Sequence, residues 1–456
     1  MPPATHSNQA ARPIGKVFLA FLLPMMLANV LQSLSGTLNN IFLGHMIGVK
    51  ALAAASAFFP VFLFLISFVM GLGSGASVLI GQAWGARQPE RVRAVAGTTL
   101  TVGMLGGLVV ALFGGSFAHT LLTRLNTPPD IMAEATNYAR ICLYAMPGFF
   151  AFLLMTQILR GVGDTITPLR ALIVSTAVGL IVTPAFIAGW AGLPQLGVSS
   201  AAVGFVTSFL ITFVWLTIYL RWKGHALALD SQLMKHMRID GAILKNVLRI
   251  GLPTAMQMVI MSLAEVVLLS MVNHFGSDAT AAYGVGNQVL GYVQFPAMSI
   301  AIAASILGAQ AIGAGHTERL GAITRTGIMI NLAITGSLLL LGYVFARHVI
   351  SLFTTNPEAT AIAVRLLYIV LWSTLLFGCA AVFSGVMRSS GTVVVPTLLS
   401  ICAILLVEVP VAWLMSHRIG IDGVWMGYPS AFLTMLILQS CYYRFVWRKQ
   451  RIQRLI

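Results

Sequence analysis

Two carboxylates stand inside apolar segments of the chain, where charged side chains are rare. Glu265 interrupts the run MVIMSLAEVVLLSMV at 258–272, and Glu408 lies in LLVEVPVAW. A charge at the centre of a membrane helix costs roughly 2.5–3.5 kcal/mol, so such residues usually face a bundle interior and mark the path of an ion or a proton. We interpret Glu265 as a coupling group of a transporter, with a buried hydrogen bond as the alternative. Glu408 is the second coupling candidate, with pairing to a polar neighbour as its alternative.

Amide and thioether side chains accompany Glu265 in the second half of the chain. Methionine is flexible and polarizable, which suits a surface that accepts varied ligands. The candidates for a substrate cavity are Gln257, Met261, Asn287, Gln288 and Asn331. The sequence has no close-spaced metal-ligand cluster, nucleophile elbow or ATP-binding loop. We therefore expect no enzymatic activity, no metal and no cofactor, and transport driven by a gradient of protons or sodium ions.

The composition indicates a membrane protein. Of the 456 residues, 58% are hydrophobic and 9% are charged, and the mean hydropathy is +0.90. Soluble domains carry about 25% charged residues, so this composition argues against soluble enzymes. The net charge of +15 does not indicate a nucleic-acid partner, because Lys and Arg collect in alternate short segments between the apolar runs. That distribution is typical of the positive-inside rule for membrane topology.

Twelve apolar segments are long enough to be membrane spans. They cover about 17–42, 52–82, 95–118, 136–159, 170–190, 199–220, 247–272, 280–312, 326–346, 360–387, 394–415 and 424–443. With the N-terminus placed in the cytoplasm, 21 of the 27 basic residues fall on the inner side, which predicts that both termini are cytoplasmic. The second and eighth segments are long enough to be tilted or bent.

The two halves of the chain repeat each other. The motif ILRGVGDTITP, which contains Arg160, recurs 228 positions later as VMRSSGTVVVP, which contains Arg388. Gln82 in GQAWGARQPERV recurs at the same offset as Gln310 in AQAIGAGHTERL. Six spans in each half give both halves the same direction through the membrane. The glycines of MGLGSGAS at 70–77 are predicted to let helices pack closely.

These patterns predict an all-α integral membrane protein. Its twelve transmembrane helices should form two six-helix lobes related by a pseudo-twofold axis along the membrane normal. The predicted parts are a cytoplasmic tail at 1–16, an N-lobe at 17–220, a cytoplasmic linker at 221–246, a C-lobe at 247–443 and a basic cytoplasmic tail at 444–456. Transporters built from such repeats bind substrate near mid-membrane between the halves and rock one half against the other.

Taken together, these motifs resemble the multidrug and toxic compound extrusion (MATE) family. The resemblance covers nearly all of 17–443, with Pro24 and Pro253 in the first span of each half. The motifs LGHMIGVKALAA, GQAWGARQPERV and LRGVGDTITP follow in order. The resemblance implies a V-shaped pair of six-helix lobes and export of organic, often cationic compounds in exchange for sodium ions or protons. A glutamate in span seven is a cation-site residue in the NorM-like branch, and Glu265 fits that position.

The sequence departs from the family at other acidic positions. An aspartate common in span one falls at Asn39, and one found in span five of the DinF-like branch falls at Thr183. The NorM-like aspartate of span ten falls near 377–379, which reads Phe-Gly-Cys. A sodium site built from several carboxylates is therefore not expected, whereas one buried carboxylate is enough to carry a proton. Asn39 joins the candidates for the substrate cavity.

We therefore expect a multi-pass exporter in a bacterial inner membrane, coupled to protons rather than sodium ions. Its partners should be small organic cations or other hydrophobic drugs and membrane lipids, without nucleic acid, and it should be a monomer. The rival within the same superfamily is a lipid-headgroup flippase, whose cavity would be lined by arginines, yet no arginine lies in mid-span. A membrane receptor or enzyme is the rival from another class. It would need a catalytic cluster or a sizeable extramembrane domain.

Overall fold

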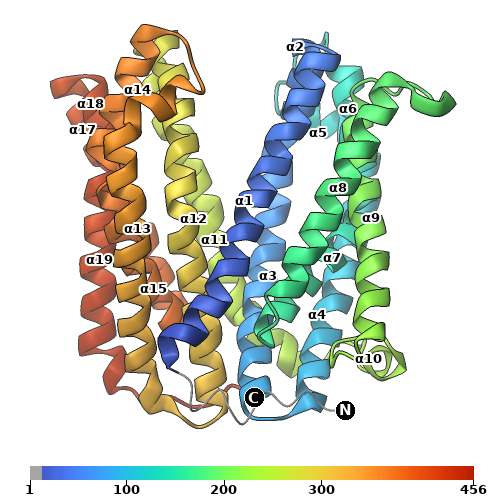
Figure 1. Ribbon diagram of the computed structural model, residues 1–456, viewed down its shortest axis with the longest axis vertical. Coiled ribbons are helices and arrows are strands. Elements are labelled where there is room, and N and C mark those ends of the chain that lie inside the picture. Colours follow the sequence, from blue (N-terminus) through green and yellow to red (C-terminus); the bar gives the residue numbers. More distant parts are fainter. Residues whose placement is uncertain (1–12) are drawn as a thin grey trace. The chain divides into compact units, whose positions relative to one another are not determined.

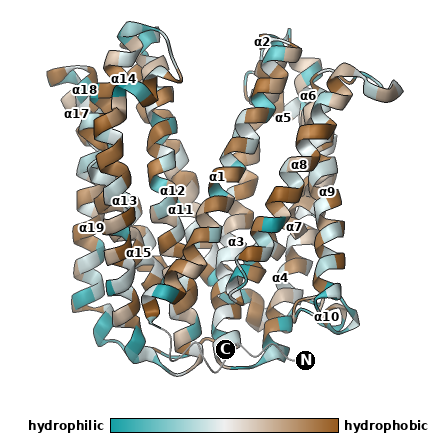
Figure 2. Cartoon of the chain, in the orientation of Figure 1, coloured by the Kyte–Doolittle hydropathy of each residue, from teal (hydrophilic) through white to brown (hydrophobic). Residues whose placement is uncertain are grey.

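The computed structural model describes residues 13–456 as helices joined by short loops (Figure 1). Ten helices in this part of the chain are long and apolar enough to cross a membrane, and two pairs of bent helices pass the same test together. Counting each pair as one span gives the predicted twelve within the described residues. Residues 13–456 contain no strand, which confirms the all-α fold. Figure 2 shows hydrophobic residues along the helices and hydrophilic residues at many of their ends. Most of the predicted tail at 1–16 lies outside the described residues.

The chain forms two compact units, whose limits differ from those of the predicted lobes. The C-unit contains Met1–Met26 and Met256–Ile456, and the N-unit contains Leu27–Ala255. The limits therefore fall inside α1 (Ile14–Met46) and inside α11 (Gly241–Asn273). The start of span one therefore belongs to the C-unit, and the start of span seven belongs to the N-unit. The predicted lobes at 17–220 and 247–443 differ from the units in these two segments.

Apolar packing and close backbone contact explain this exchange. Phe18, near the start of α1, is fully buried in a C-unit core that includes Ile300 and Val382. Gly251, near the start of α11, packs in the N-unit, where a Cβ on it would lie 2.7 Å from the carbonyl oxygen of Gly71. Each of these helices therefore begins in one unit and continues in the other.

The N-unit is a helical bundle in which α3 packs on α4 and α7, and α8 packs on α9. Besides the end of α1 and the start of α11, its helices are α2 (Val49–Ala57), α3 (Phe59–Gly85), α4 (Pro89–Val109), η1 (Val110–Gly114), α5 (Ala118–Arg124), α6 (Met132–Tyr144), α7 (Met146–Gly161), α8 (Ile166–Ala188), η2 (Trp190–Gly192), α9 (Ser199–Trp222) and α10 (Ser231–Lys235).

The C-unit is organised around α12, which packs on α13, α14 and α15, and α15 packs in turn on α19. Besides the start of α1 and the rest of α11, its helices are α12 (Ser277–Gly313), η3 (Thr317–Arg319), α13 (Leu320–Ser351), α14 (Pro357–Val370), α15 (Ser373–Ser389), α16 (Val394–Ala403), η4 (Ile404–Glu408), α17 (Val409–Ile419), α18 (Ile421–Trp425), α19 (Gly427–Phe445) and η5 (Trp447–Lys449).

Two bends of more than 40° lie in the fourth and tenth spans, and the predicted second span is divided between α2 and α3 at Phe58. Helices α6 and α7 meet at 55°, and helices α14 and α15 meet at 47°. Pro147 stands in the first turn of α7, where it cannot continue the hydrogen-bond ladder of α6. The tenth span bends without a proline at its break. The eighth span, α12, continues through Pro296 as one helix.

Residues that match each other in the two halves of the sequence have the same backbone conformation or the same position in a helix. Gly48 and Gly276, 228 positions apart, precede α2 and α12 with φ of 130° and 102°, a region that favours glycine. Arg160 and Arg388, also 228 positions apart, both lie in the last turn of their helices, α7 and α15. Each unit therefore builds its share of the repeat in the same way.

Glycines in α3 allow a close approach of α11 within the N-unit. A Cβ on Gly75 would lie 2.3 Å from the carbonyl oxygen of Val247, and one on Gly71 would lie 2.5 Å from that of Gly251. No side chain fits at such distances, so the glycines at 70–77 serve close helix packing, as predicted.

Each unit has a closing segment, which follows its last long helix and folds back onto the loop after α7 or α15. In the N-unit this segment is 223–240, and His225 Nε2 lies 3.6 Å from Asp164 Oδ2 in the loop after α7. In the C-unit it is 446–456, and Trp447 Nε1 donates a hydrogen bond to Ser390 Oγ, 3.0 Å away in the loop after α15. The two repeats therefore close the same loop with different chemistry.

The N-unit contact should make stability depend on pH. Burial lowers the pKa of His225, and the neighbouring Asp164 carboxylate opposes this change without reversing it. The folded state then binds a proton less readily than the unfolded state, so acidification below about pH 6.5 favours unfolding. We expect the unfolding temperature in detergent to fall more steeply between pH 7 and pH 5 for the wild type than for His225→Gln. Exposed His119 supplies the control, since His119→Gln should keep the wild-type slope. Equal slopes for all three proteins would contradict this role of His225.

Candidate functional site: a carboxylate–tyrosine cluster

Glu265 lies on α11 in the C-unit, on one stripe of the helix with Gln257 and Met261. The spacing of four residues places the three side chains on the same face. Gln257 and Met261 are half-buried, whereas Glu265 is exposed. Its neighbours Ala264 and Leu268 are buried and carry the packing of this part of α11. On the neighbouring helix face, Ala264 packs into the bundle, one residue before Glu265.

Glu408 is the buried carboxylate of the C-unit, with 5% of its surface exposed. It ends the π-helical turn η4, two residues before Pro410. Proline cannot donate to the carbonyl of Leu406, and its ring crowds that group, so a widened turn forms here. A Cβ on Gly427 would lie 2.8 Å from the carbonyl oxygen of Glu408. The main chain at Glu408 therefore lies against the start of α19, next to Tyr428.

Two buried tyrosines connect these helices. The hydroxyls of Tyr283 on α12 and Tyr428 on α19 lie 2.9 Å apart. The Tyr283 hydroxyl also donates to the main-chain carbonyl of Glu265 over 3.4 Å. Each phenol has a single O–H, so Tyr428 is left to donate to Tyr283. The ring of Tyr283 stacks on Trp425, with centroids 5.6 Å apart and planes at 8°, which fixes its position.

The four groups form one connected unit, here called the carboxylate–tyrosine cluster: Glu265, Tyr283, Glu408 and Tyr428. Tyr283 joins the main chain of Glu265 to the hydroxyl of Tyr428, and Tyr428 follows Gly427, which lies against the carbonyl of Glu408. Chemically, the cluster can hold and release a proton and can attract a cation to its accessible member, Glu265.

Asn331, another cavity candidate, is held by hydrogen bonds inside the C-unit. Its side chain is fully buried on α13. The amide donates to the carbonyl of Leu375 on α15 over 3.1 Å and contacts Cys379 Sγ, while its oxygen accepts from Thr335 over 2.8 Å. With these partners Asn331 ties α13 to α15, so the polar group expected in a cavity is satisfied inside the bundle.

The remaining cavity candidates lie on two helices. Asn287 is half-buried one turn after Tyr283 on α12, and the next residue, Gln288, is exposed. Both belong to the C-unit with the cluster. Asn39 is half-buried on the part of α1 that belongs to the N-unit.

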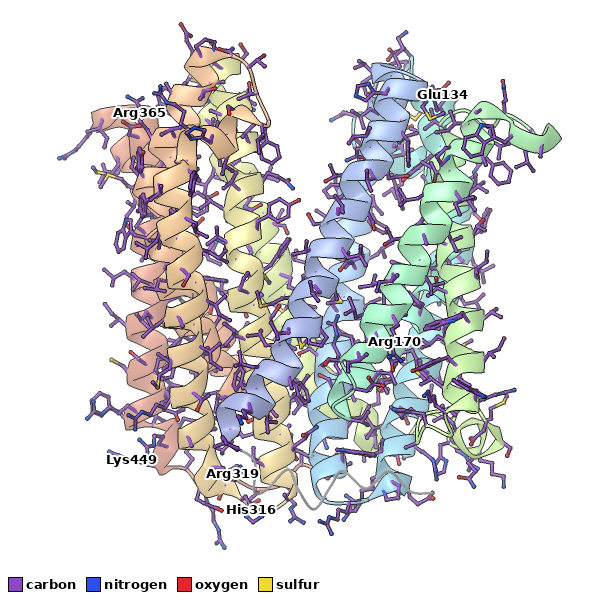
Figure 3. All side chains as sticks on the ribbon, in the orientation of Figure 1. Glu134, Arg170, His316, Arg319, Arg365 and Lys449 are labelled. Atoms are coloured by element: carbon purple, nitrogen blue, oxygen red, sulfur yellow. The ribbon has the colours of Figure 1, made fainter. Side chains whose placement is uncertain are left out.

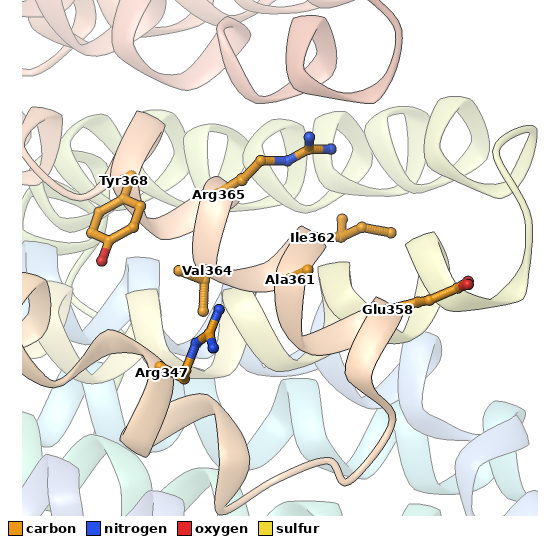
Figure 4. A pocket seen from close by; sticks show the side chains of 7 residues that line it. All are labelled: Arg347, Glu358, Ala361, Ile362, Val364, Arg365 and Tyr368. Atoms are coloured by element: carbon orange, nitrogen blue, oxygen red, sulfur yellow. The ribbon is translucent and has the colours of Figure 1, made fainter.

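An open pocket of about 500 Å³ lies elsewhere in the C-unit, at the end of α13 and along α14 (Figure 4). It is lined by Arg347, Glu358, Ala361, Ile362, Val364, Arg365 and Tyr368. Nε of Arg365 lies 3.5 Å from Oδ1 of Asp422, so one of its two arginines already has an acidic partner. The pocket contains none of the predicted site residues.

Sequence reasoning missed the two tyrosines. Tyr283 and Tyr428 belong to no motif, and a tyrosine in an apolar segment is usually an ordinary core or interface residue. The one available signal was the position of Tyr283, one turn before the candidate Asn287 on the same helix.

Comparison with known proteins identifies the family. The model of the MatE family matches residues 24–185 and 253–414, one stretch in each half of the chain. The chain belongs to the MATE family. A MATE relative from Bacillus subtilis (strain 168), the probable multidrug resistance protein YoeA, is 48% identical over 456 residues, covering 100% of this chain and 98% of the relative. The multidrug export protein MepA of Staphylococcus aureus (strain MRSA252) is 24% identical over 414 residues, covering 90% of this chain and 89% of its own.

Solved MATE structures share the fold. A mutant of the Vibrio cholerae MATE transporter VcmN has a TM-score of 0.89 at 20% identity, covering 96% of this chain and 98% of its own. An outward-facing multidrug resistance MATE transporter has a TM-score of 0.88 at 23% identity, covering 95% and 96%. At these identities the likeness concerns the fold alone.

Proposed function

We propose that the protein is a secondary active exporter that exchanges organic, often cationic compounds for protons by alternating access. The observation that carries this proposal is the carboxylate–tyrosine cluster, in which hydrogen-bonded tyrosines connect the helix of Glu265 to the helix that packs on the buried Glu408. The names of the relatives, a probable multidrug resistance protein and a multidrug export protein, support varied drugs as substrates.

The exchange rests on competition at Glu265. When ionised, its carboxylate attracts a cationic drug, and when protonated it loses that attraction. Glu408, the buried carboxylate of the cluster, is the second candidate for carrying the proton. Tyr283 and Tyr428 connect the main chain of Glu265 to α19 by hydrogen bonds, so a movement of α11 at this point would carry to α19. Coupling further requires that the drug and the proton favour different arrangements of the transporter.

We also propose a substrate cavity that is richer in methionine, aromatic and amide groups than in charges. Gln257 and Met261 share a helix face with Glu265, and Asn287 is half-buried on the neighbouring α12, which supports them as lining residues. The protein would act as a monomer in the inner membrane of a bacterium, with both termini in the cytoplasm.

Transport by the purified protein in proteoliposomes tests this function. Ethidium should accumulate or leave against its gradient when a pH gradient is imposed and should respond little to a sodium gradient of equal size. Sodium-driven transport would contradict the proton coupling and keep the antiport. Absence of drug transport together with movement of a fluorescent lipid between leaflets would replace the exporter by the flippase.

A further inference from the structure

The last two residues of α19 and the closing segment of the C-unit, together residues 444–456, are rich in basic side chains. Residues 444–456 contain no Asp or Glu and carry five positive charges: Arg444, Arg448, Lys449, Arg451 and Arg454. All five side chains are exposed. Within the described part of the chain, none of the ion pairs involves any of them. Their charges therefore remain available to an anionic partner.

The segment is attached to the bundle, which holds these charges in place. Trp447 is 1% exposed, and its ring stacks on Tyr443 with centroids 5.2 Å apart. Its indole N–H donates to Ser390 in the loop after α15. Near the end of the chain, Leu455 fits against Gly391, where a Cβ would lie 2.8 Å from the leucine Cδ1. A basic segment fixed in this way loses less conformational freedom on binding than a loose tail would.

The anchored segment lies where spans end. Figure 3 places Lys449 at the same end of the C-unit as His316 and Arg319, and Arg365 at the opposite end. The phenol of Tyr443 lies 2.9 Å from Thr324 Oγ1, near the start of α13. Phe445, at the end of α19, is 61% exposed. An exposed aromatic ring beside basic side chains at the end of a span is typical of the headgroup layer of a membrane.

We propose that residues 444–456 bind the phosphate-bearing headgroups of acidic phospholipids at this end of the protein. Anionic lipids attract basic residues close to a span, and each such residue strengthens the association roughly fivefold. Five charges on an anchored segment are therefore enough for a strong preference over zwitterionic lipid. Because the segment contacts the loops after α12 and α15, bound lipid stabilises the C-unit rather than the tail alone.

The test compares the full-length protein in nanodiscs of phosphatidylcholine with nanodiscs that also contain phosphatidylglycerol. We expect the wild type to unfold at a higher temperature with phosphatidylglycerol and to retain that lipid preferentially in native mass spectrometry. The variant with Arg444, Arg448, Lys449 and Arg451 changed to Gln should lose this enrichment at least tenfold, since each charge contributes roughly fivefold. Changing the three arginines to Lys keeps the charge and should preserve the enrichment.

A matched loss of four charges elsewhere supplies the control. Arg91, Lys235, Lys245 and Arg249 are exposed in the N-unit, and their change to Gln should weaken the lipid preference much less than the change in residues 444–456 does. Equal loss in both variants would overturn the proposal by showing that net charge alone matters. A wild type without any preference for phosphatidylglycerol would also overturn it. If inorganic phosphate in phosphatidylcholine nanodiscs stabilises the protein as much as the lipid does, the segment is a phosphate site and not a lipid site.

Discussion

Replacement of Glu265 by Gln should abolish proton-driven drug efflux while leaving the protein folded. Gln keeps the shape of the side chain, but it cannot ionise, so neither proton release nor attraction of a cation remains. The main-chain carbonyl that accepts from Tyr283 is unchanged, so the hydrogen bond to α12 should persist. Efflux of ethidium driven by a pH gradient, measured at matched expression, should fall to the background of cells without the protein. Glu265→Asp should retain part of the activity.

Two further variants separate a specific role from a general effect of charge. Glu134 is exposed in the N-unit, and Glu134→Gln removes the same charge far from the cluster along the chain. It should transport normally. Near-normal efflux by Glu265→Gln would remove Glu265 from the mechanism and leave a structural role for it. In that case Glu408→Gln becomes the decisive variant, since Glu408 is the remaining carboxylate of the cluster.

A methyl group at position 75 should destabilise the protein strongly. A Cβ on Gly75 would lie 2.3 Å from the carbonyl oxygen of Val247, a main-chain atom that can move only with α11. Overpacking of this kind typically costs roughly 1–3 kcal/mol. We expect Gly75→Ala to lower the unfolding temperature in detergent by several degrees and to reduce the yield of folded protein.

Gly106 offers the matched control for this substitution. It lies inside α4 in the same unit, and a Cβ there would meet nothing within 4 Å. Alanine favours helix over glycine by up to about 1 kcal/mol, so Gly106→Ala should leave stability unchanged or raise it. If Gly75→Ala proved as stable as Gly106→Ala, the close contact between α3 and α11 would be absent in the membrane.

The repeated apolar segments made the fold predictable. Length and hydropathy alone located the spans, because a membrane helix must satisfy its own main chain and expose apolar side chains. The offset of 228 between Arg160 and Arg388 anticipated that both end their helices in the same way. The bends in spans four and ten were not predictable in the same manner. The second of them has no proline at its break.

The site was predictable only in part. A carboxylate in an apolar run is visible in any sequence, so Glu265 and Glu408 could be named, but not the fact that they lie together. That pairing depends on the contact of η4 with α19 and on a hydrogen bond between tyrosines 145 positions apart. Periodicity gives the face of a helix but not which face the bundle covers, so the different burial of Glu265 and Glu408 was not predictable. The partners of Asn331 were not predictable either, because its hydrogen bond to Leu375 depends on how α13 packs on α15.

The exchange of helix beginnings between the two units bears on the order in which the chain assembles. Phe18 is buried beside residues near 300 and 382, so the start of α1 has no complete core until the second half of the chain has been synthesised. The closing contacts are more local, since His225 reaches back to Asp164 and Trp447 to Ser390 within a single repeat. The closing contact of each repeat can therefore form as soon as that repeat has been synthesised. The start of α1 can pack only after the second half of the chain is present. We therefore expect that a chain cut within 223–240, the closing segment of the N-unit, yields two halves. These halves should complete their bundles only when they are produced together.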